Sequence, residues 1–145
     1  MAYTEKFAGH GLLGAPAAID LTSAAVHSHS MIVGSKMFID RIMLCVSTAT
    51  VSTGNIVVAF KKRPTPGSAV GESTIGSLTI PTAIAAGKVY YKDISSANFE
   101  VGDQLVFEVT TAAAGGGAAG QAVPMFDGHE DPEVPANQSD MVASA

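Results

Sequence analysis

Two histidines lie two residues apart in the segment Val26-His27-Ser28-His29-Ser30, a spacing that a pair of metal ligands could use. In a strand, His27 and His29 would share a face, and imidazole nitrogens are ordinary zinc ligands. Three copies around a symmetry axis could then enclose a metal ion. The simpler interpretation, which we prefer, is that both are polar residues in an irregular Ser/His segment.

A second group of possible metal ligands comprises Asp127, His129 and Asp131. Carboxylate oxygens are the ligands that calcium prefers, but the spacing does not match the loop of an EF-hand. The surrounding residues are acidic and have no hydrophobic period. We therefore interpret the three residues as part of a solvated acidic tail, and we expect neither a metal nor a cofactor site.

Glycine runs occur at two places where a phosphate-binding loop could be sought. The run Gly115-Gly116-Gly117 continues into alanines, and Gly87-Lys88 has no glycine at the required upstream spacing. Neither matches the glycine-rich loop that ends in Gly-Lys-Ser/Thr. We interpret the Ala/Gly segment 112–120 as a flexible hairpin loop.

Nucleophilic catalysis would need a serine or cysteine beside a base and an orienting acid. No Gly-x-Ser-x-Gly motif occurs in the chain. The single cysteine, Cys45, lies inside an apolar run, which predicts a buried small hydrophobic side chain. We therefore expect the protein not to be an enzyme.

Charge and hydrophobicity argue against two classes of partner. The chain has 8 Lys and Arg against 13 Asp and Glu, and its one short basic run is Lys61-Lys62-Arg63. Because a nucleic-acid surface must be basic, we expect no nucleic-acid partner. We interpret the basic run as a solvated strand end, with contact to an acidic neighbour as the alternative.

The apolar residues do not form a membrane span. The longest run of bulky apolar residues, 42–46, is far shorter than the ~20 that a span requires. The opening residues MAYTEKFAGHG show no basic region followed by an apolar core, so we expect neither a signal peptide nor a membrane partner. The triplet Asn137-Gln138-Ser139 then matches a glycosylation acceptor only by chance.

The clearest secondary-structure signal is the segment 100–111. A turn is predicted at 101–103, after which Leu105, Phe107 and Val109 alternate with mostly polar residues. A strand with one apolar face and one wet face is typical of an antiparallel sheet that is covered on one side. A second sheet must therefore supply the cover.

Seven further segments have the composition of short strands, and none has a convincing helical pattern. These segments are 19–22, 31–33, 36–47, 56–60, 78–80, 89–92 and 121–126. Pro124 predicts that the last of them lies at a sheet edge, because proline cannot donate to a β-ladder.

The segment 36–47 is apolar on both faces when it is drawn as a strand. By simple alternation, the faces are Phe38, Ile42, Leu44 and Val46, and Met37, Ile39, Met43 and Cys45. The same spacing permits a helix, but the neighbouring segments are strands and no helix cap precedes it. We predict a strand with one face in the core and the other against a partner.

About eight strands in 145 residues predict an all-β fold, a two-sheet antiparallel sandwich of jelly-roll type. We expect an extended N-terminal arm at 1–16, the β-sandwich domain at 17–126 and an acidic C-terminal tail at 127–145. Charged residues make up only 14% of the chain, against roughly 25% in an average soluble domain. Together with a mean hydropathy of +0.30, this favours a homo-oligomer, unless the many Ala and Gly residues inflate the index.

Several stretches of the chain resemble small virion structural proteins of tailed bacteriophages. They are VVAFKKRPTPGS from Val57 to Ser68, then IGSLTIP, AGKVYYKDIS, VGDQLVFEVTTAAAGGGAAG and the closing PEVPANQSDM. The resemblance covers residues 37–145 approximately and brings no assigned functional residues. It implies a β-sandwich virion component, a capsid decoration or cement protein or else a part of the neck, tail or fibre base.

The same resemblance implies virion localisation, with the major capsid protein or other virion proteins as partners. The symmetry of capsid attachment sites suggests a homotrimer. A carbohydrate-binding module is the alternative from another class, because β-sandwiches often bind sugars through aromatic side chains. The chain has no tryptophan and its Tyr90-Tyr91 pair is predicted to lie mid-strand, so an exposed tyrosine face would be needed to favour that alternative.

Overall fold

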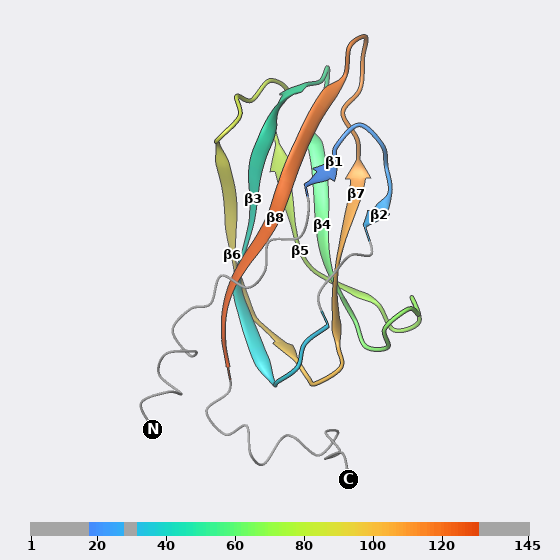
Figure 1. Cartoon of the computed structure of the whole chain (residues 1–145), viewed down its shortest axis with the longest axis vertical. Helices are drawn as coiled ribbons and strands as arrows, with labels where there is room; N and C mark the ends of the chain where they lie inside the picture. The colour runs from blue at the N-terminus through green and yellow to red at the C-terminus, as the bar shows by residue number, and fades with distance from the viewer. Residues whose placement is uncertain (1–17, 28–31, 131–145) are drawn as a thin grey trace.

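Eight antiparallel strands form two facing sheets in the computed structural model, which describes residues 18–27 and 32–130 (Figure 1). The prediction of an all-β, two-sheet antiparallel sandwich is confirmed. The strands are β1 (Ile19–Asp20), β2 (Val26–His27), β3 (Met37–Val51), β4 (Ile56–Arg63), β5 (Ser73–Ile80), β6 (Val89–Phe99), β7 (Gln104–Thr111) and β8 (Ala119–Glu130).

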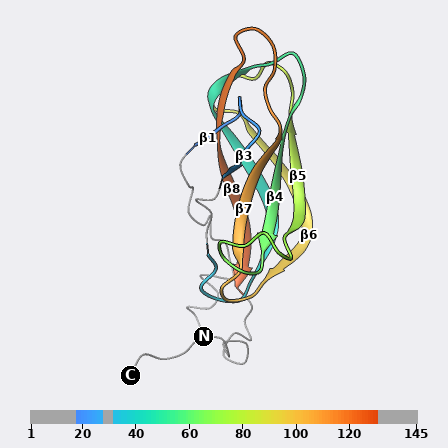
Figure 2. The same cartoon turned by 90° about the vertical axis from the view of Figure 1, so that its right-hand side faces the viewer.

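The strand order is that of a jelly roll. One sheet has the order β1-β8-β3-β6 and the other β2-β7-β4-β5. Successive strands therefore alternate between the sheets, except at the β4–β5 hairpin, which stays within one sheet. This double wrapping of the chain is the jelly-roll arrangement. Figure 2 shows the strands of both sheets running along the same long direction.

The hydrophobic core lies between the sheets, because each long strand turns one apolar face inward. The alternation in β7 places Leu105, Phe107 and Val109 inside, as predicted. Phe107 meets Phe60 edge to face, with ring centroids 5.1 Å apart, a geometry that adds about 0.5–1.5 kcal/mol beyond burial itself. Phe99 and Phe126 complete the set of large buried aromatic side chains.

The face assignment for β3 is wrong at its start, because a β-bulge interrupts the alternation. The register shifts between Ile39 and Arg41 against both neighbouring strands, and the extra residue changes which side chains point inward. The buried side chains of this strand's apolar part are Met37, Ile39, Ile42, Leu44 and Val46. Phe38 therefore lies on the outer face with Met43 and Cys45.

The predicted boundary between the sandwich and the tail is also wrong, because β8 continues four residues past Phe126. Asp127, Gly128, His129 and Glu130 pair with β3 between Met37 and Arg41. Their polar composition resembles a tail, but backbone pairing does not require apolar side chains. At Gly128, a β-carbon would overlap the carbonyl oxygen of Phe38, so the close approach of the two strands requires glycine here.

The remaining strands differ from prediction at their ends. The segment expected at 31–33 contributes only an isolated bridge between Ile32 and Gln104, while Val26 and His27, expected to be irregular, form β2. β5 begins at Ser73, five residues before the predicted segment 78–80. β1 pairs with β8 only at Gln121 and Ala122. At Pro124, β3 is therefore the single neighbour of β8 among the described strands. The expected arm at 1–16 and residues 131–145 lie outside the described residues.

Candidate interaction surfaces

The outer face of the β8-β3-β6 sheet carries six apolar side chains in two cross-strand rows. In one row, Met43 lies opposite Tyr91 on β6 and Met125 on β8; in the next, Cys45 lies opposite Val89 and Val123. We call these six residues the apolar face: Met43, Cys45, Val89, Tyr91, Val123 and Met125. Val89 and Tyr91 are exposed, and the other four are partly buried by their neighbours.

The alternation of inward and outward side chains in β3 after the bulge produces this face. Ile42 and Leu44 have no exposed surface, so Met43 and Cys45 must point away from the core. Cys45 is therefore a free, partly exposed thiol on an outer surface, and the prediction of a buried cysteine is wrong. The prediction that one face of this strand packs in the core is confirmed for residues 42–46, and a partner on the other face stays a prediction.

A charged row borders the apolar face at one end. Arg41 lies opposite Asp93 on β6 and Asp127 on β8, and its Nε is 2.6 Å from Asp93 Oδ1. The hydrogen bond that Arg41 donates to Asp93 raises the pKa of Arg41 and lowers the pKa of Asp93. Both side chains are well exposed, so solvent screens the pair and it adds little to stability.

Tyr91 is the most exposed aromatic side chain of the described chain, with 61% of its surface accessible. The Arg41 guanidinium lies 4.6 Å from the ring centroid and covers part of one ring face. Tyr90 packs against the core instead. The two tyrosines therefore point to opposite sides of the edge strand β6 and do not form a joint aromatic platform.

Beyond the charged row, Asp40 joins three strands through its carboxylate. Ser96 Oγ donates a hydrogen bond to Asp40 Oδ1 at 2.7 Å, and His129 Nδ1 lies 2.6 Å from Oδ2. Phe38 stacks on the His129 ring with centroids 5.3 Å apart. The serine hydroxyl is bound to the acid and not to the imidazole, so the group lacks the serine–base contact of a nucleophilic triad. These contacts hold β3, β6 and β8 together at this end of their sheet.

The three cations Lys61, Lys62 and Arg63 are held by carboxylates of the same chain. Lys61 Nζ contacts Glu108 and lies 3.3 Å from Glu72, while Arg63 Nη2 is 2.8 Å from Glu72. Lys62 Nζ is 3.3 Å from Asp103. The alternative of acidic neighbours is therefore right, and the interpretation as a solvated strand end is wrong. The outer side of β7 is therefore less exposed to solvent than predicted.

This ion-pair cluster anchors the β4–β5 connection, residues 64–72, which protrudes from the sandwich in Figure 1. The Arg63 Nε donates to Glu72 Oε2 at 2.8 Å, and the Gly67 N–H donates to Gln104 Oε1 at 3.4 Å. Both ends and the middle of the connection are thereby tied to β4 and β7. Val70, with 81% of its surface exposed, lies on this connection.

The candidate ligand groups from the sequence do not come together as sites in the described residues. The backbone of His27 pairs with Phe107, while His29, Asp131 and the Asn137 triplet lie outside the described ranges. Asp127 and His129 share the outer side of β8, but His129 is bound to Asp40. Within residues 18–27 and 32–130, no group of three His, Cys, Asp or Glu side chains is placed to hold a metal ion.

The glycine run lies in the connection between β7 and β8. Gly115 and Gly117 have positive φ angles, and a β-carbon on Gly115 would overlap the methyl group of Thr53. The Thr53 N–H also donates to the Ala114 carbonyl at 2.8 Å. The expected loop is thus present at 112–118, packed against the turn between β3 and β4.

The chain matches no protein-family model, and neither the curated proteins nor the solved structures contain a significant match. Among the described residues there is also no helix of the length and apolarity that a membrane crossing would need.

Proposed function

We propose that this protein is a structural component of a tailed-bacteriophage particle and attaches to the capsid as a decoration or cement protein. The observation that supports this most is the apolar face, an uncharged sheet surface with a charged border. That composition is typical of a protein–protein interface, whose core is depleted of charge and whose rim is polar. The resemblance of the sequence to phage virion proteins suggests the kind of particle.

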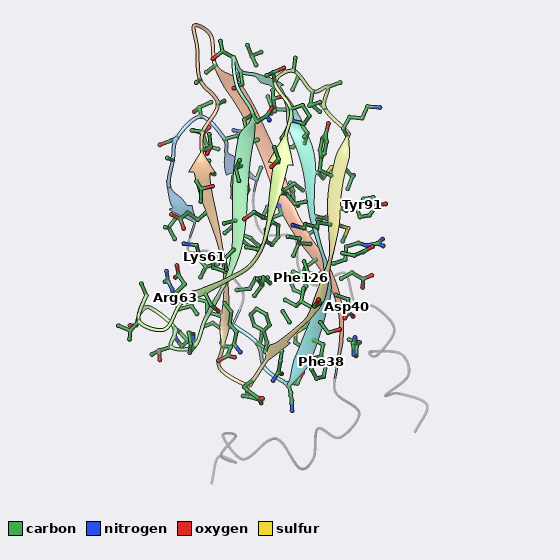
Figure 3. The ribbon with its side chains drawn as sticks, turned by 180° about the vertical axis from the view of Figure 1, so that it is seen from behind. Phe38, Asp40, Lys61, Arg63, Tyr91 and Phe126 are labelled. Carbon is green, nitrogen blue, oxygen red and sulfur yellow. The ribbon has the colours of Figure 1, made fainter. Side chains whose placement is uncertain are left out.

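The two outer faces of the sandwich differ, as an assembly component requires. The outer face of β4 and β7 is occupied by internal ion pairs, among them Lys61–Glu108 and Arg63–Glu72. The outer face of β3, β6 and β8 presents Met43, Met125 and Tyr91 without a described cover. Figure 3 labels Lys61 and Arg63 on one side of the sandwich and Tyr91 on the other.

In this proposal the protein stabilises a shell without chemistry. A protein that binds the assembled shell, and not its separated subunits, shifts the equilibrium toward the assembled state by mass action. The jelly-roll sandwich supplies a stiff body for such contacts, because its two sheets share one continuous core. We expect the major capsid protein to be the principal partner, and the neck, tail or fibre base is the alternative location.

A carbohydrate-binding module is the second candidate, and one observation favours it. Tyr91 is exposed at the rim of the sheet, where a sugar ring could stack on it. The cation–π contact with Arg41 occupies part of the ring, and the neighbouring apolar side chains are aliphatic or sulfur-containing. The site offers one aromatic ring, and the hydrogen-bonding groups Arg41 and Asp93 beside it already bind each other, so we rank it second.

The proposal is tested by mixing purified protein with phage heads that lack it. We expect saturable binding and a higher melting temperature of the shell at full occupancy, because bound protein stabilises only the assembled state. Purified tails from the same phage are the control. Binding to tails and not to heads would assign the protein to the tail. Binding to neither would contradict a virion function.

A further inference from the structure

We infer that the apolar face binds the apolar face of a second copy of this chain, around a two-fold axis that sets the facing strands antiparallel. The inference rests on the proposed assembly function and makes it more specific. It names a second copy of the chain as the first partner of the apolar face. Four features of the described residues support it: the contrast between the outer faces, the protected edge of β6, the size of the outer side that surrounds the face and the position of its charges.

The contrast between the outer faces favours a two-fold contact. A contact around a two-fold axis uses the same patch on both copies, whereas a ring of three needs two different patches that fit one another. On the opposite sheet, the outer face presents Thr79, Thr110 and the Lys61–Glu108 pair. Val26 and Val57 also lie on that outer face, but their cross-strand neighbours are Glu108, Thr79 and Thr111, so they form no apolar rows. The apolar face therefore matches itself best. This favours a dimer over the trimer that the resemblance suggested.

The free edge of the same sheet is poorly suited to pairing with another chain. β6 is the last strand in the sheet order, and its Lys92 lies opposite Ile42, which has no exposed surface. Lys92 is therefore on the inner side of an edge strand, and an inward-pointing charge opposes the addition of a further strand. The register shift opposite Asp40 interrupts the same edge. A second copy is thus better placed on the face than on the edge.

The outer side of the sheet that surrounds the apolar face is large enough for a specific contact. β3, β6 and β8 have 15, 11 and 12 residues. With about 3.3 Å per residue and about 4.8 Å between strands, their outer side projects to roughly 600 Å². Since side chains make the accessible area larger than the projection, the whole outer side of the sheet, with the apolar face near its middle, approaches the ~800 Å² per partner of an ordinary specific interface.

The charges select the antiparallel arrangement. If the axis ran along the strands, β8 of one copy would cover β6 of the other, and Asp127 would face the partner's Asp93. If the axis instead runs across the strands, between the rows of Met43 and Cys45, all six apolar side chains of each copy are covered. The charged row then faces the polar row of the partner, where Thr48 and Gln121 lie side by side. Like charges are thereby separated.

The test compares the full chain with two variants by sedimentation equilibrium. Met43→Glu should weaken self-association about a hundredfold, because it places an unpaired charge at the centre of the contact. The matched control, Thr79→Glu, adds the same charge to an exposed position on the outer face of the other sheet and should leave association unchanged. Circular dichroism and thermal melts check that both variants remain folded.

A chemical cross-link provides a second measurement that does not depend on a substitution. Cys45 is the single cysteine of the chain, and in the proposed arrangement the two copies of it lie about 12 Å apart across the interface. A bismaleimide of that length should give a covalent dimer from the wild-type protein and not from Met43→Glu.

The outcomes separate this inference from the proposed function. A monomeric wild-type protein that still binds phage heads would overturn the inference and leave the decoration role standing, with the shell on the apolar face. A monomer in which Met43→Glu lowers the melting temperature would also overturn it, since the chain would then be covering its own face. Dimerisation through Met43 without binding to heads or tails would support the inference and contradict the virion role.

Discussion

Gly128→Ala is expected to destabilise the protein by about 3 kcal/mol, the upper part of the range for overpacked positions. A β-carbon at this position overlaps the carbonyl oxygen of Phe38 and approaches Ile39 Cα to 3.3 Å. Both are backbone atoms of the neighbouring strand, which cannot rotate away as a side chain can. The start of β3 and the end of β8 must therefore separate, and the contacts of Asp40 with His129 are lost with them.

Urea denaturation of Gly128→Ala, with Gly116→Ala as the matched control, measures this effect. A β-carbon at Gly116 meets no atom within 4 Å, and Gly116 is not among the glycines with positive φ. The control should therefore unfold like the wild type or slightly later, since alanine restricts the unfolded chain. Equal stabilities for all three proteins would mean that residues 127–130 do not pair with β3 in solution.

Glu72→Gln is expected to cost about 2 kcal/mol at pH 7, because Arg63 keeps its charge and loses its partner in a largely buried position. The Arg63 and Glu72 side chains are only 11% and 13% exposed. Lys61 limits the loss, since it retains Glu108. The matched control is Asp93→Asn, which removes a carboxylate from an exposed pair with Arg41 and should produce no measurable change.

The effect of Glu72→Gln should disappear at low pH. Burial of the Glu72 carboxyl opposes ionisation, but hydrogen bonds from Arg63 and Lys61 outweigh it and lower the pKa below the ordinary value of 4.5. Folding therefore favours the ionised form, and the stabilisation is complete above the ordinary pKa and is lost as the pH falls through the lower, folded-state pKa. Denaturation curves at pH 7 and pH 3 measure the difference between the proteins. A gap of the same size at both values would contradict this account.

The sequence predicts the strands best where alternation is uninterrupted. Leu105, Phe107 and Val109 could be assigned to the core because β7 pairs with β4 without a register shift from Gln104 to Val109. In β3, alternation predicts the wrong face for Phe38, because the bulge at Asp40 is a property of two paired backbones. A signal was nevertheless present: Asp40 and Arg41 are adjacent charges in an apolar strand, and a bulge allows both to avoid the core.

Two other features could not be predicted because they depend on long-range pairing. Asp127 to Glu130 have the composition of a tail, and only their neighbours on β3 show that they belong to a strand. The partners of Lys61 and Arg63 include Glu72, nine residues beyond Arg63 across the β4–β5 connection, and Glu108 on β7. The apolar face has the same origin: Met43, Tyr91 and Met125 come from three strands, and no local pattern places them in one row.

The central claim is that the apolar face is a protein interface, and methionine oxidation tests it most directly. Met43 and Met125 lie on the face, while Met37 is buried in the core and serves as the internal reference. The measurement is the rate at which dilute peroxide oxidises each of the three, by mass spectrometry, in dissociated and in assembled protein. The account predicts that assembly slows oxidation of Met43 and Met125 about tenfold or more, in keeping with their exclusion from solvent, and leaves Met37 unchanged. Equal rates for Met43 and Met125 in the two states would contradict it.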